Sequence, residues 1–324
     1  MVRNRRSERG ARLTSTQVSE KSWSAGRRPA WEGRQAAITL TVITALFLIE
    51  SVIAVIPGAL PASLNAPLFN LLLNLFVIVH ALSIYRVWDV VAFYAVTLVV
   101  SFTLENIGVL TGFPFGSYYY SDALGPKLGE VPILIGFSYV GAAYASWVMA
   151  LILLRVWGSP LRGSTIFFVP FFAAIFMVMW DLTFDPANST LKQWWIWQDG
   201  GAYFGVPISN FAGWYLTVFV FMLIFATYLR ATAGSDATQM ATGRMDTSGR
   251  LIWISAALVY MAMGVRWVPF DSIAGASQAI DGAGQAWNET AIIQSLGLIT
   301  VFTMWAVGAL AIYTVVTGRR PRGK

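Results

Sequence analysis

The sequence lacks cysteine and holds a single histidine among its 324 residues. Without cysteine the chain can form no disulfide and offers no thiolate to a metal ion. One histidine cannot build the histidine-based sites that zinc and other transition metals prefer. The G-x-G-x-x-G motif of dinucleotide-binding proteins is also missing. We therefore expect neither a bound metal nor a cofactor.

Charged residues are also scarce. They make up 12% of the chain, whereas hydrophobic residues make up 56%. A soluble protein would carry about 25% charged residues. This composition indicates a polytopic membrane protein in contact with membrane lipid, with no nucleic-acid partner.

Long apolar runs predict an all-α integral membrane protein with about eight transmembrane helices, because one span needs about 20 apolar residues. The runs lie at roughly 36–57, 67–85, 88–105, 132–154, 164–181, 207–229, 251–268 and 291–316. If the N-terminus is cytoplasmic, 19 Lys and Arg residues fall on the inner side and three on the outer side. This bias follows the positive-inside rule, so we expect both termini in the cytoplasm and the protein in the cell membrane.

The charge distribution also suggests how the chain is divided. Residues 1–34 contain nine basic and three acidic residues, which equals the net charge of +6 for the whole chain. We expect residues 1–35 to be a disordered basic cytoplasmic tail and residues 318–324 to be a second basic cytoplasmic tail. Residues 36–317 would form the polytopic membrane domain.

Two polar clusters interrupt the apolar chain, and the expected topology puts both at the outer face. The first begins at Glu105, at the end of the third span, and the second begins at Asp181, at the end of the fifth. A carboxylate in a membrane span is costly unless it has partners or a function. A carboxylate at a helix C-terminus also opposes the helix dipole. Glu105 and Asp181 are therefore the first candidates for a functional role.

The two clusters are similar to each other. In each, an aromatic and glycine-containing loop leads into a Val-Pro-Ile sequence, at Val131–Ile133 and at Val206–Ile208. Spans three and four, and spans five and six, therefore suggest two copies of one helical hairpin. Because both hairpins start on the inner side, the repeat would be parallel.

The clusters contain two long motifs. The first is Glu105-Asn106-Ile107-Gly108-Val109, followed by Thr111-Gly112-x-Pro114-Phe115-Gly116-x-Tyr118-x-Tyr120-Ser121-Asp122. The second is Asp181-Leu182-x-x-Asp185-Pro186, then Trp197, then Gly201-x-Tyr203-Phe204-Gly205-Val206-Pro207-x-x-Asn210-Phe211-x-Gly213-Trp214. These motifs resemble the carotenoid 1,2-hydratase family of the CruF type. The resemblance covers roughly residues 36–316 and is dense from about 100 to 215.

The resemblance implies an integral membrane enzyme of carotenoid biosynthesis. Such an enzyme, a hydro-lyase, adds water to the terminal 1,2 double bond of an acyclic carotenoid ψ-end and gives a tertiary alcohol. The substrate would be a lycopene-like carotenoid or a C50 precursor.

Hydration of an isolated trisubstituted alkene needs a proton donor, an environment that tolerates a tertiary cation, and delivery of water. A buried carboxylic acid can donate the proton, and the candidates are Glu105, Asp181, Asp185 and Glu50. Aromatic faces stabilise a cation by about 0.5–2 kcal/mol each, and the candidates are Tyr118, Tyr120, Trp197, Tyr203 and Trp214. A carboxylate base could position the water together with Asn106 or Asn210.

Several candidates also have structural explanations. Asp185 precedes Pro186 and suits a turn. Glu50 could pair with His80 or with a hydroxyl group. The tryptophans suit the aromatic belt at the membrane interface.

Two other classes of function remain open. A membrane prenyltransferase acting on isoprenoids needs two Asp-rich motifs for Mg²⁺ and pyrophosphate, and only Asp181-x-x-x-Asp185 is present, with Lys192 as the nearby base. A non-enzymatic carotenoid-binding or transport protein is the other alternative. Transporters favour midplane sites and inverted repeats, whereas these clusters lie near one face.

Overall fold

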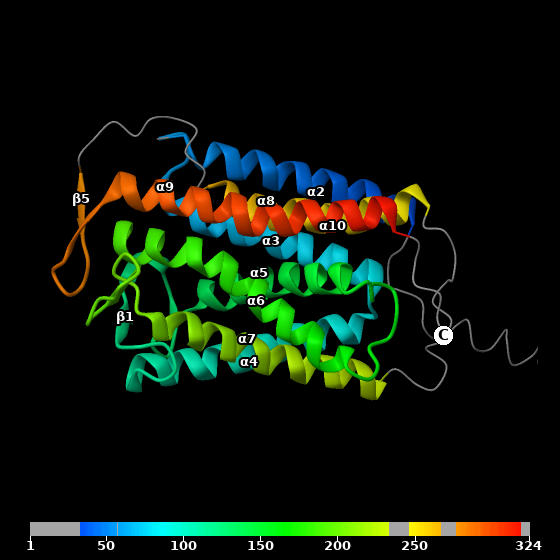
Figure 1. The fold of residues 1–324 in the computed structure, drawn as a ribbon, viewed down its shortest axis with the longest axis horizontal. Coiled ribbons are helices and arrows are strands. Elements are labelled where there is room, and N and C mark those ends of the chain that lie inside the picture. Colours follow the sequence, from blue (N-terminus) through cyan, green and yellow to red (C-terminus); the bar gives the residue numbers. More distant parts are fainter. Residues whose placement is uncertain (1–32, 57, 233–245, 267–276, 319–324) are drawn as a thin grey trace, which may run out of the picture.

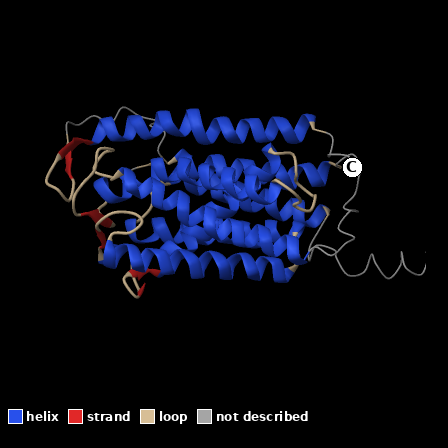
Figure 2. Cartoon of the chain, turned by 60° about the horizontal axis from the view of Figure 1, so that its bottom comes forward, coloured by secondary structure: helices blue, strands red, loops and turns tan. Residues whose placement is uncertain are grey.

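The computed structural model describes residues 33–56, 58–232, 246–266 and 277–318. In these residues, eight helical spans are long and apolar enough to cross a membrane. They run side by side as a bundle, with the short strands gathered at one end (Figures 1 and 2). The prediction of an all-α membrane protein with eight spans is therefore confirmed. The predicted tails at 1–35 and 318–324 lie almost wholly outside the described residues.

The spans and the small elements between them have the following bounds in the described residues. The spans are α2 (Arg34–Ile53), α3 (Ala62–Ile84), α4 (Val87–Thr111), α5 (Ile133–Leu153), α6 (Thr165–Pro186) continued by the π-helix η2 (Ala187–Leu191), α7 (Ile208–Thr232), α8 (Thr247–Val265), and α9 (Glu289–Thr300) continued by the π-helix η4 (Val301–Trp305) and α10 (Ala306–Thr317). The small elements are β1 (Tyr118–Tyr120), the 3₁₀-helix η1 (Asp122–Leu124), β2 (Lys127–Leu128), β3 (Val131–Pro132), β4 (Trp195–Trp197), β5 (Gln278–Ile280) and β6 (Ala286–Asn288).

Helix α5 lies at the centre of the bundle and is the most buried span. It packs against α3, α4, α6, α8 and α10. Small residues allow this close approach: a side chain at Gly136 would collide with Phe102, and one at Gly141 would collide with Leu73. Small residues at helix contacts are typical of membrane bundles, where close backbone packing replaces the hydrophobic effect.

Both polar clusters lie at the strand end of the bundle. Strand β1 of the first cluster pairs in antiparallel register with β4 of the second, and Tyr118 lies opposite Trp197. The β5–β6 hairpin lies at the same end (Figure 1). It contacts the second cluster through the Gln193 side-chain amide, which donates to the Ile280 carbonyl at 3.2 Å.

The helix ends expected at the carboxylates are wrong. Helix α4 continues past Glu105 to Thr111, and it ends where Gly112 takes a left-handed conformation at φ 79°. Helix α6 continues past Asp181 and Asp185, so Asp185 is not a turn residue. Pro186 is the last residue of α6, and the chain continues from it as a π-helix. The Ser189 hydroxyl then bonds the Asp185 carbonyl at 2.9 Å.

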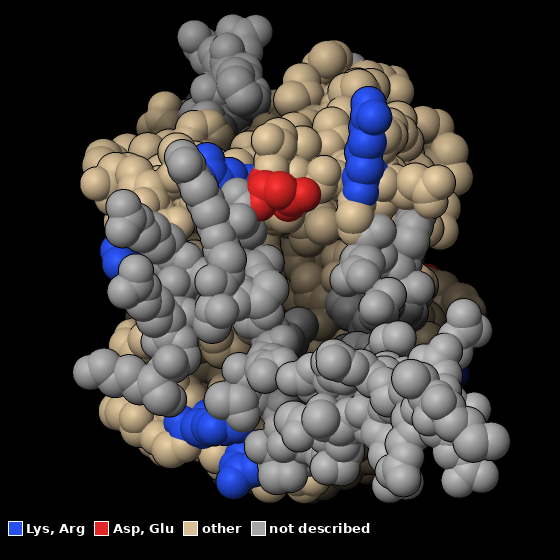
Figure 3. Space-filling model, turned by 90° about the vertical axis from the view of Figure 1, so that its right-hand side faces the viewer, with Lys and Arg blue, Asp and Glu red and all other residues tan. Residues whose placement is uncertain are grey.

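The described Lys and Arg residues are divided unequally between the two ends of the bundle. The end without strands has Arg34, Arg86, Arg155, Arg162, Arg230 and Arg250, whereas the strand end has Lys127, Lys192 and Arg266. Figure 3 looks onto the end without strands and shows basic side chains spread around it. The described Lys and Arg residues thus show the same unequal distribution from which we expect both termini to lie in the cytoplasm.

Candidate active site

Glu105 is a buried carboxyl surrounded by tyrosine hydroxyl groups. Its Oε2 accepts hydrogen bonds from Tyr118 at 2.5 Å and Tyr120 at 2.9 Å, and its Oε1 accepts one from Tyr139 at 2.6 Å. Tyr118 and Tyr120 reach the same carboxyl because alternate residues of a strand point to the same face. Burial, and then the Glu105 carboxyl, raise the pKa of both hydroxyls well above the ordinary tyrosine value. Both therefore keep their protons and act as donors.

Asp185 has a matching arrangement in the second cluster. Its Oδ1 accepts from the indole nitrogens of Trp195 at 2.9 Å and Trp197 at 3.0 Å. Its Oδ2 accepts from the Asn210 amide at 2.6 Å. Trp195 and Trp197 are alternate residues of β4, as Tyr118 and Tyr120 are of β1. The side-chain pattern therefore makes Asp185, and not Asp181, the counterpart of Glu105.

The two hairpins meet through equivalent residues. Tyr139 lies seven residues after Pro132, and Trp214 lies seven residues after Pro207. Their rings stack with centroids 4.2 Å apart and planes 4° from parallel. Together with the antiparallel pairing of β1 and β4, this contact is expected of two hairpins related by a two-fold axis along the bundle.

Asp181 lies one helical turn before Asp185 and is fully buried. Its Oδ2 accepts from the Asn210 amide nitrogen at 3.1 Å, so that one nitrogen bridges both carboxyls. Its Oδ1 has no hydrogen-bond partner among the described residues. Asp181 therefore stands behind Asp185 and is tied to it through Asn210.

A cavity of about 340 Å³ joins the two carboxyls, and we call it the carboxyl cavity. Its lining residues are Glu105, Phe115, Tyr118, Tyr120, Ile135, Ser138, Phe184, Asp185, Trp195, Trp197, Asn210 and Trp214. None of these twelve is Lys, Arg or His. Seven of the sequence candidates line this cavity, namely Glu105, Tyr118, Tyr120, Asp185, Trp197, Asn210 and Trp214. Asp181 does not line the cavity, but it accepts a hydrogen bond from Asn210 in the cavity wall.

Three sequence candidates lie elsewhere. The Asn106 side chain bonds the Phe102 carbonyl at 2.8 Å and the Glu130 amide at 2.8 Å, so it fixes the loop behind α4. The Tyr203 hydroxyl donates to the Leu182 carbonyl at 2.9 Å and does not reach the carboxyl cavity.

Glu50 is the third of these. It pairs with Arg266 in a buried ion pair, and Arg266 also bonds Asn65. The expected pairing of Glu50 with His80 or a hydroxyl group is wrong. The Arg266 side chain, at the C-terminal end of α8, contacts Glu50 on α2 instead. His80 instead bonds the Tyr144 hydroxyl at 2.8 Å and the Ile252 carbonyl at 3.0 Å.

Sequence reasoning did not identify Tyr139 as the third residue that donates a hydrogen bond to Glu105. The signal was its distance from Pro132, which equals the distance of Trp214 from Pro207. Trp195 also donates a hydrogen bond to Asp185, as Trp197 does. The alternation of Trp195 and Trp197 along the chain was the sequence pattern that could have indicated this.

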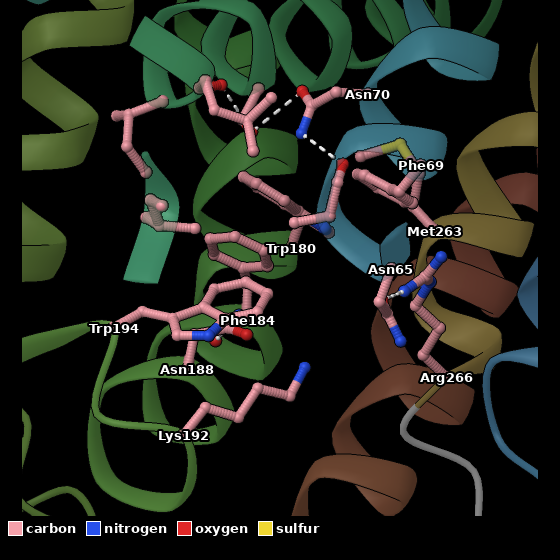
Figure 4. A pocket seen from close by; sticks show the side chains of 15 residues that line it. Asn65, Phe69, Asn70, Trp180, Phe184, Asn188, Lys192, Trp194, Met263 and Arg266 are labelled. Carbon is pink, nitrogen blue, oxygen red and sulfur yellow. Dashed lines mark hydrogen bonds between the residues drawn. The ribbon is translucent and has the colours of Figure 1, made fainter. Parts of the chain in front are cut away.

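A second cavity of about 470 Å³ adjoins the first, and we call it the asparagine cavity after Asn65, Asn70 and Asn188 in its wall. The two cavities share Ile135, Ser138 and Phe184 as lining residues. Trp180, Phe184 and Asn188 line one side of it, and Asn65, Phe69 and Arg266 line the other (Figure 4).

Comparisons with known proteins place this site in context. Bisanhydrobacterioruberin hydratase from Haloarcula japonica is 29% identical over 201 residues. The match covers 61% of this chain and 63% of the relative, so the chain spans less than two thirds of the relative's length. No solved structure matches the chain.

The sequence model of a family described as carotenoid biosynthesis protein matches residues 65–274. This range is well over half of the chain and includes every residue that lines the carboxyl cavity. The chain therefore belongs to the carotenoid biosynthesis protein family.

Proposed function

We propose that this protein is an enzyme of carotenoid biosynthesis that adds water to the terminal double bond of an acyclic carotenoid. The observation that carries the proposal is the carboxyl cavity, where Glu105 and Asp185 face one aromatic-lined space without a basic side chain in its lining. Such a space suits a reaction that passes through a carbocation. The relative described as a hydratase supports the same class of reaction.

The reaction needs one protonated carboxyl and one ionised carboxyl. The protonated member of the Glu105–Asp185 pair donates its proton to the less substituted carbon of the alkene. The π electrons form the new C–H bond and leave a tertiary cation. The oxygen of a water molecule attacks the cation, and the ionised carboxylate accepts the proton that this water loses. The alkene and water thus become a tertiary alcohol, and proton exchange with water resets the two carboxyls.

The electrostatics of the site support this scheme. Glu105, Asp181 and Asp185 are all buried, and ionising three buried carboxyls together would be very costly. We assign one negative charge and two protons to the three groups before reaction. The single charge stabilises the cation, and the faces of Tyr118, Trp197 and Trp214 add to this stabilisation.

Asp181 has a supporting role in this proposal. It touches the carboxyl cavity only through Asn210, whose amide nitrogen bonds both aspartates. A neutral Asp181 would leave an uncharged oxygen unpartnered, which costs less than a buried unpartnered charge. Asp181 therefore positions Asn210 and Asp185, while Glu105 and Asp185 exchange protons with the substrate.

The other functions fit the site less well. A prenyltransferase must hold a pyrophosphate, and the lining of the carboxyl cavity offers no Lys or Arg for that purpose. A carotenoid-binding or transport protein has no need for several costly buried carboxyls in its site.

The proposed orientation places the carboxyl cavity near the outer face of the cell membrane, with both termini in the cytoplasm. It rests on the excess of basic residues at the other end of the bundle. The substrate would arrive from the lipid, because a carotenoid is insoluble in water. A lycopene-like carotenoid and a C50 precursor are the two substrates that we propose to test.

The test is expression of the full chain in a host that makes lycopene, and in a second host that makes an acyclic C50 carotenoid. We expect a pigment heavier by the mass of one water molecule for each hydrated end in at least one host. Unchanged pigments in both hosts, with the protein present in the membrane, would contradict the proposed reaction.

A further inference from the structure

Two buried polar groups in the asparagine cavity lack partners. Asn188 Oδ1 and Trp180 Nε1 have no hydrogen-bond partner among the described residues. Asn188 is 1% exposed and Trp180 is fully buried. Both side chains line the asparagine cavity (Figure 4). Since leaving a buried polar group without a hydrogen-bond partner is costly, each of these two groups calls for an occupant of the cavity.

The two groups have complementary hydrogen-bonding roles. The Asn188 oxygen can only accept, and the Trp180 indole nitrogen can only donate. Water can serve each of them, because a water molecule both donates and accepts hydrogen bonds. Buried waters typically bind groups that the protein leaves unsatisfied, in cavities that are polar and large enough. The asparagine cavity is lined by several polar side chains and has space for water-sized molecules.

The rim of this cavity favours water over a hydrocarbon. Lys192 and Arg266 both contribute to the lining. Burial, and then the nearby Arg266, lower the pKa of Lys192 to about 8. Charged side chains in the lining make the cavity a better environment for water than for a hydrocarbon chain.

A hydroxyl group connects the two cavities. Ser138 lines both, and its hydroxyl donates to Asn70 Oδ1 at 3.0 Å. Asn70 lines only the asparagine cavity, whereas Glu105 and Asp185 line only the carboxyl cavity. Ser138 thus gives a water molecule a polar surface between the rim and the carboxyls.

We propose that the asparagine cavity holds the water that is added to the substrate and delivers it past Ser138 to the carboxyl cavity. This inference rests on the proposed function. In it the substrate occupies the carboxyl cavity alone, and Asn188 and Trp180 bind water rather than carotenoid.

Protonation of the alkene and capture of water by the cation can be measured independently. In D₂O the acidic carboxyl donates a deuteron to the alkene. The cation then either captures water to give the alcohol, or returns a proton to the carboxylate and becomes an alkene that carries deuterium. A protein that protonates the substrate normally but receives little water should make less alcohol and still label the alkene.

The experiment uses the full chain in membranes equilibrated in D₂O, with a lycopene-like carotenoid and, separately, with an acyclic C50 carotenoid as substrate. Ala66→Leu fills the asparagine cavity from α3, where Ala66 lines that cavity and not the other. Asn188→Leu removes the polar acceptor. Leu71→Phe is the matched control, because Leu71 also lies on α3 but is 64% exposed on its outer surface. Mass spectrometry measures the alcohol formed and the deuterium in the recovered alkene.

We expect both cavity variants to form about tenfold less alcohol, in line with the loss of an ordered bridging water, while deuterium in the recovered alkene is maintained or increased. The control should match the wild type in both. If alcohol and deuterium fall together, the cavity holds the carotenoid and the proposal is wrong. Unchanged alcohol in both variants would also overturn it. A wild type that makes neither alcohol nor labelled alkene would refute the proposed function itself.

Discussion

At the scale of single residues, the paired carboxyls carry the first prediction. Glu105→Gln and Asp185→Asn keep the shape of each group but remove its acidic proton. We expect alcohol formation to fall about 10²–10⁴-fold in each, because general acid–base catalysis is typically worth that much. Deuterium labelling in D₂O identifies the roles: the variant of the donor should label no alkene, whereas the variant of the acceptor should still do so. Full product from both variants would exclude this pair.

A second prediction at this scale separates Asp181 from Asp185. Asp181 does not line the carboxyl cavity, and the amide of Asp181→Asn can still accept from Asn210. We expect Asp181→Asn to keep product formation within about tenfold of the wild type, far above Asp185→Asn. Comparing the two initial rates in membranes checks this order, and the reverse order would make Asp181 the reacting carboxyl.

The hydrogen bonds around Glu105 give a third prediction. Tyr120→Phe removes a donor to a buried carboxyl, and we expect the free energy of unfolding to fall by about 1–3 kcal/mol. Its neighbour Tyr119 is 46% exposed between Tyr118 and Tyr120, so Tyr119→Phe is a matched control that should change little. Thermal unfolding in detergent compares the two. Equal losses in both variants would show that the bond to Glu105 contributes nothing specific.

At the scale of the elements, the Glu50–Arg266 pair holds the region after α8 against α2. Arg266→Met leaves a buried carboxylate alone, and breaking such a pair typically costs about 3–5 kcal/mol. We expect the double variant Glu50→Gln, Arg266→Met to recover much of that loss, since neither charge is then unpaired. The midpoint of thermal unfolding tests this, and a double variant less stable than both single variants would contradict it.

The sequence predicted which segments form helices better than it predicted where they end. Hydropathy located all eight spans because apolar length is what a membrane requires. It placed the ends of α4 and α6 at Glu105 and Asp181, where charge lowers hydropathy. The helices continue because Tyr118, Tyr139 and Asn210 supply hydrogen bonds to these carboxyls within the bundle. Such partners come from distant segments, so a local window of sequence does not reveal them.

The distance along the chain between hydrogen-bonding partners also determined which site residues could be predicted from the sequence. Glu105, Asp185 and Asn210 stood out because polar residues are rare in this chain. The partner of Glu50 did not, since Arg266 is 216 positions away and nothing near Glu50 points to it. Tyr139 was hidden among the many aromatic residues, and only the comparison of the two hairpins distinguishes it.

At the scale of the whole molecule, the orientation in the membrane is open to a direct test. Because the chain has no cysteine, a single introduced cysteine gives an unambiguous label. We expect Ala123→Cys, at the strand end, to react with a membrane-impermeant maleimide in intact cells. Ser159→Cys, at the opposite end, should react only after the cells are opened. Both residues are exposed. The opposite result would place the carboxyl cavity at the cytoplasmic face.

The pairing of β1 with β4 has a mechanical consequence. Each strand supplies the donors for its own hairpin's carboxyl, yet each is also hydrogen-bonded to the other strand. A displacement of the loop that contains β1 or of the loop that contains β4 must therefore disturb the hydrogen-bond donors of both Glu105 and Asp185. A substitution that distorts one of the two loops should therefore weaken proton donation and proton acceptance at the same time.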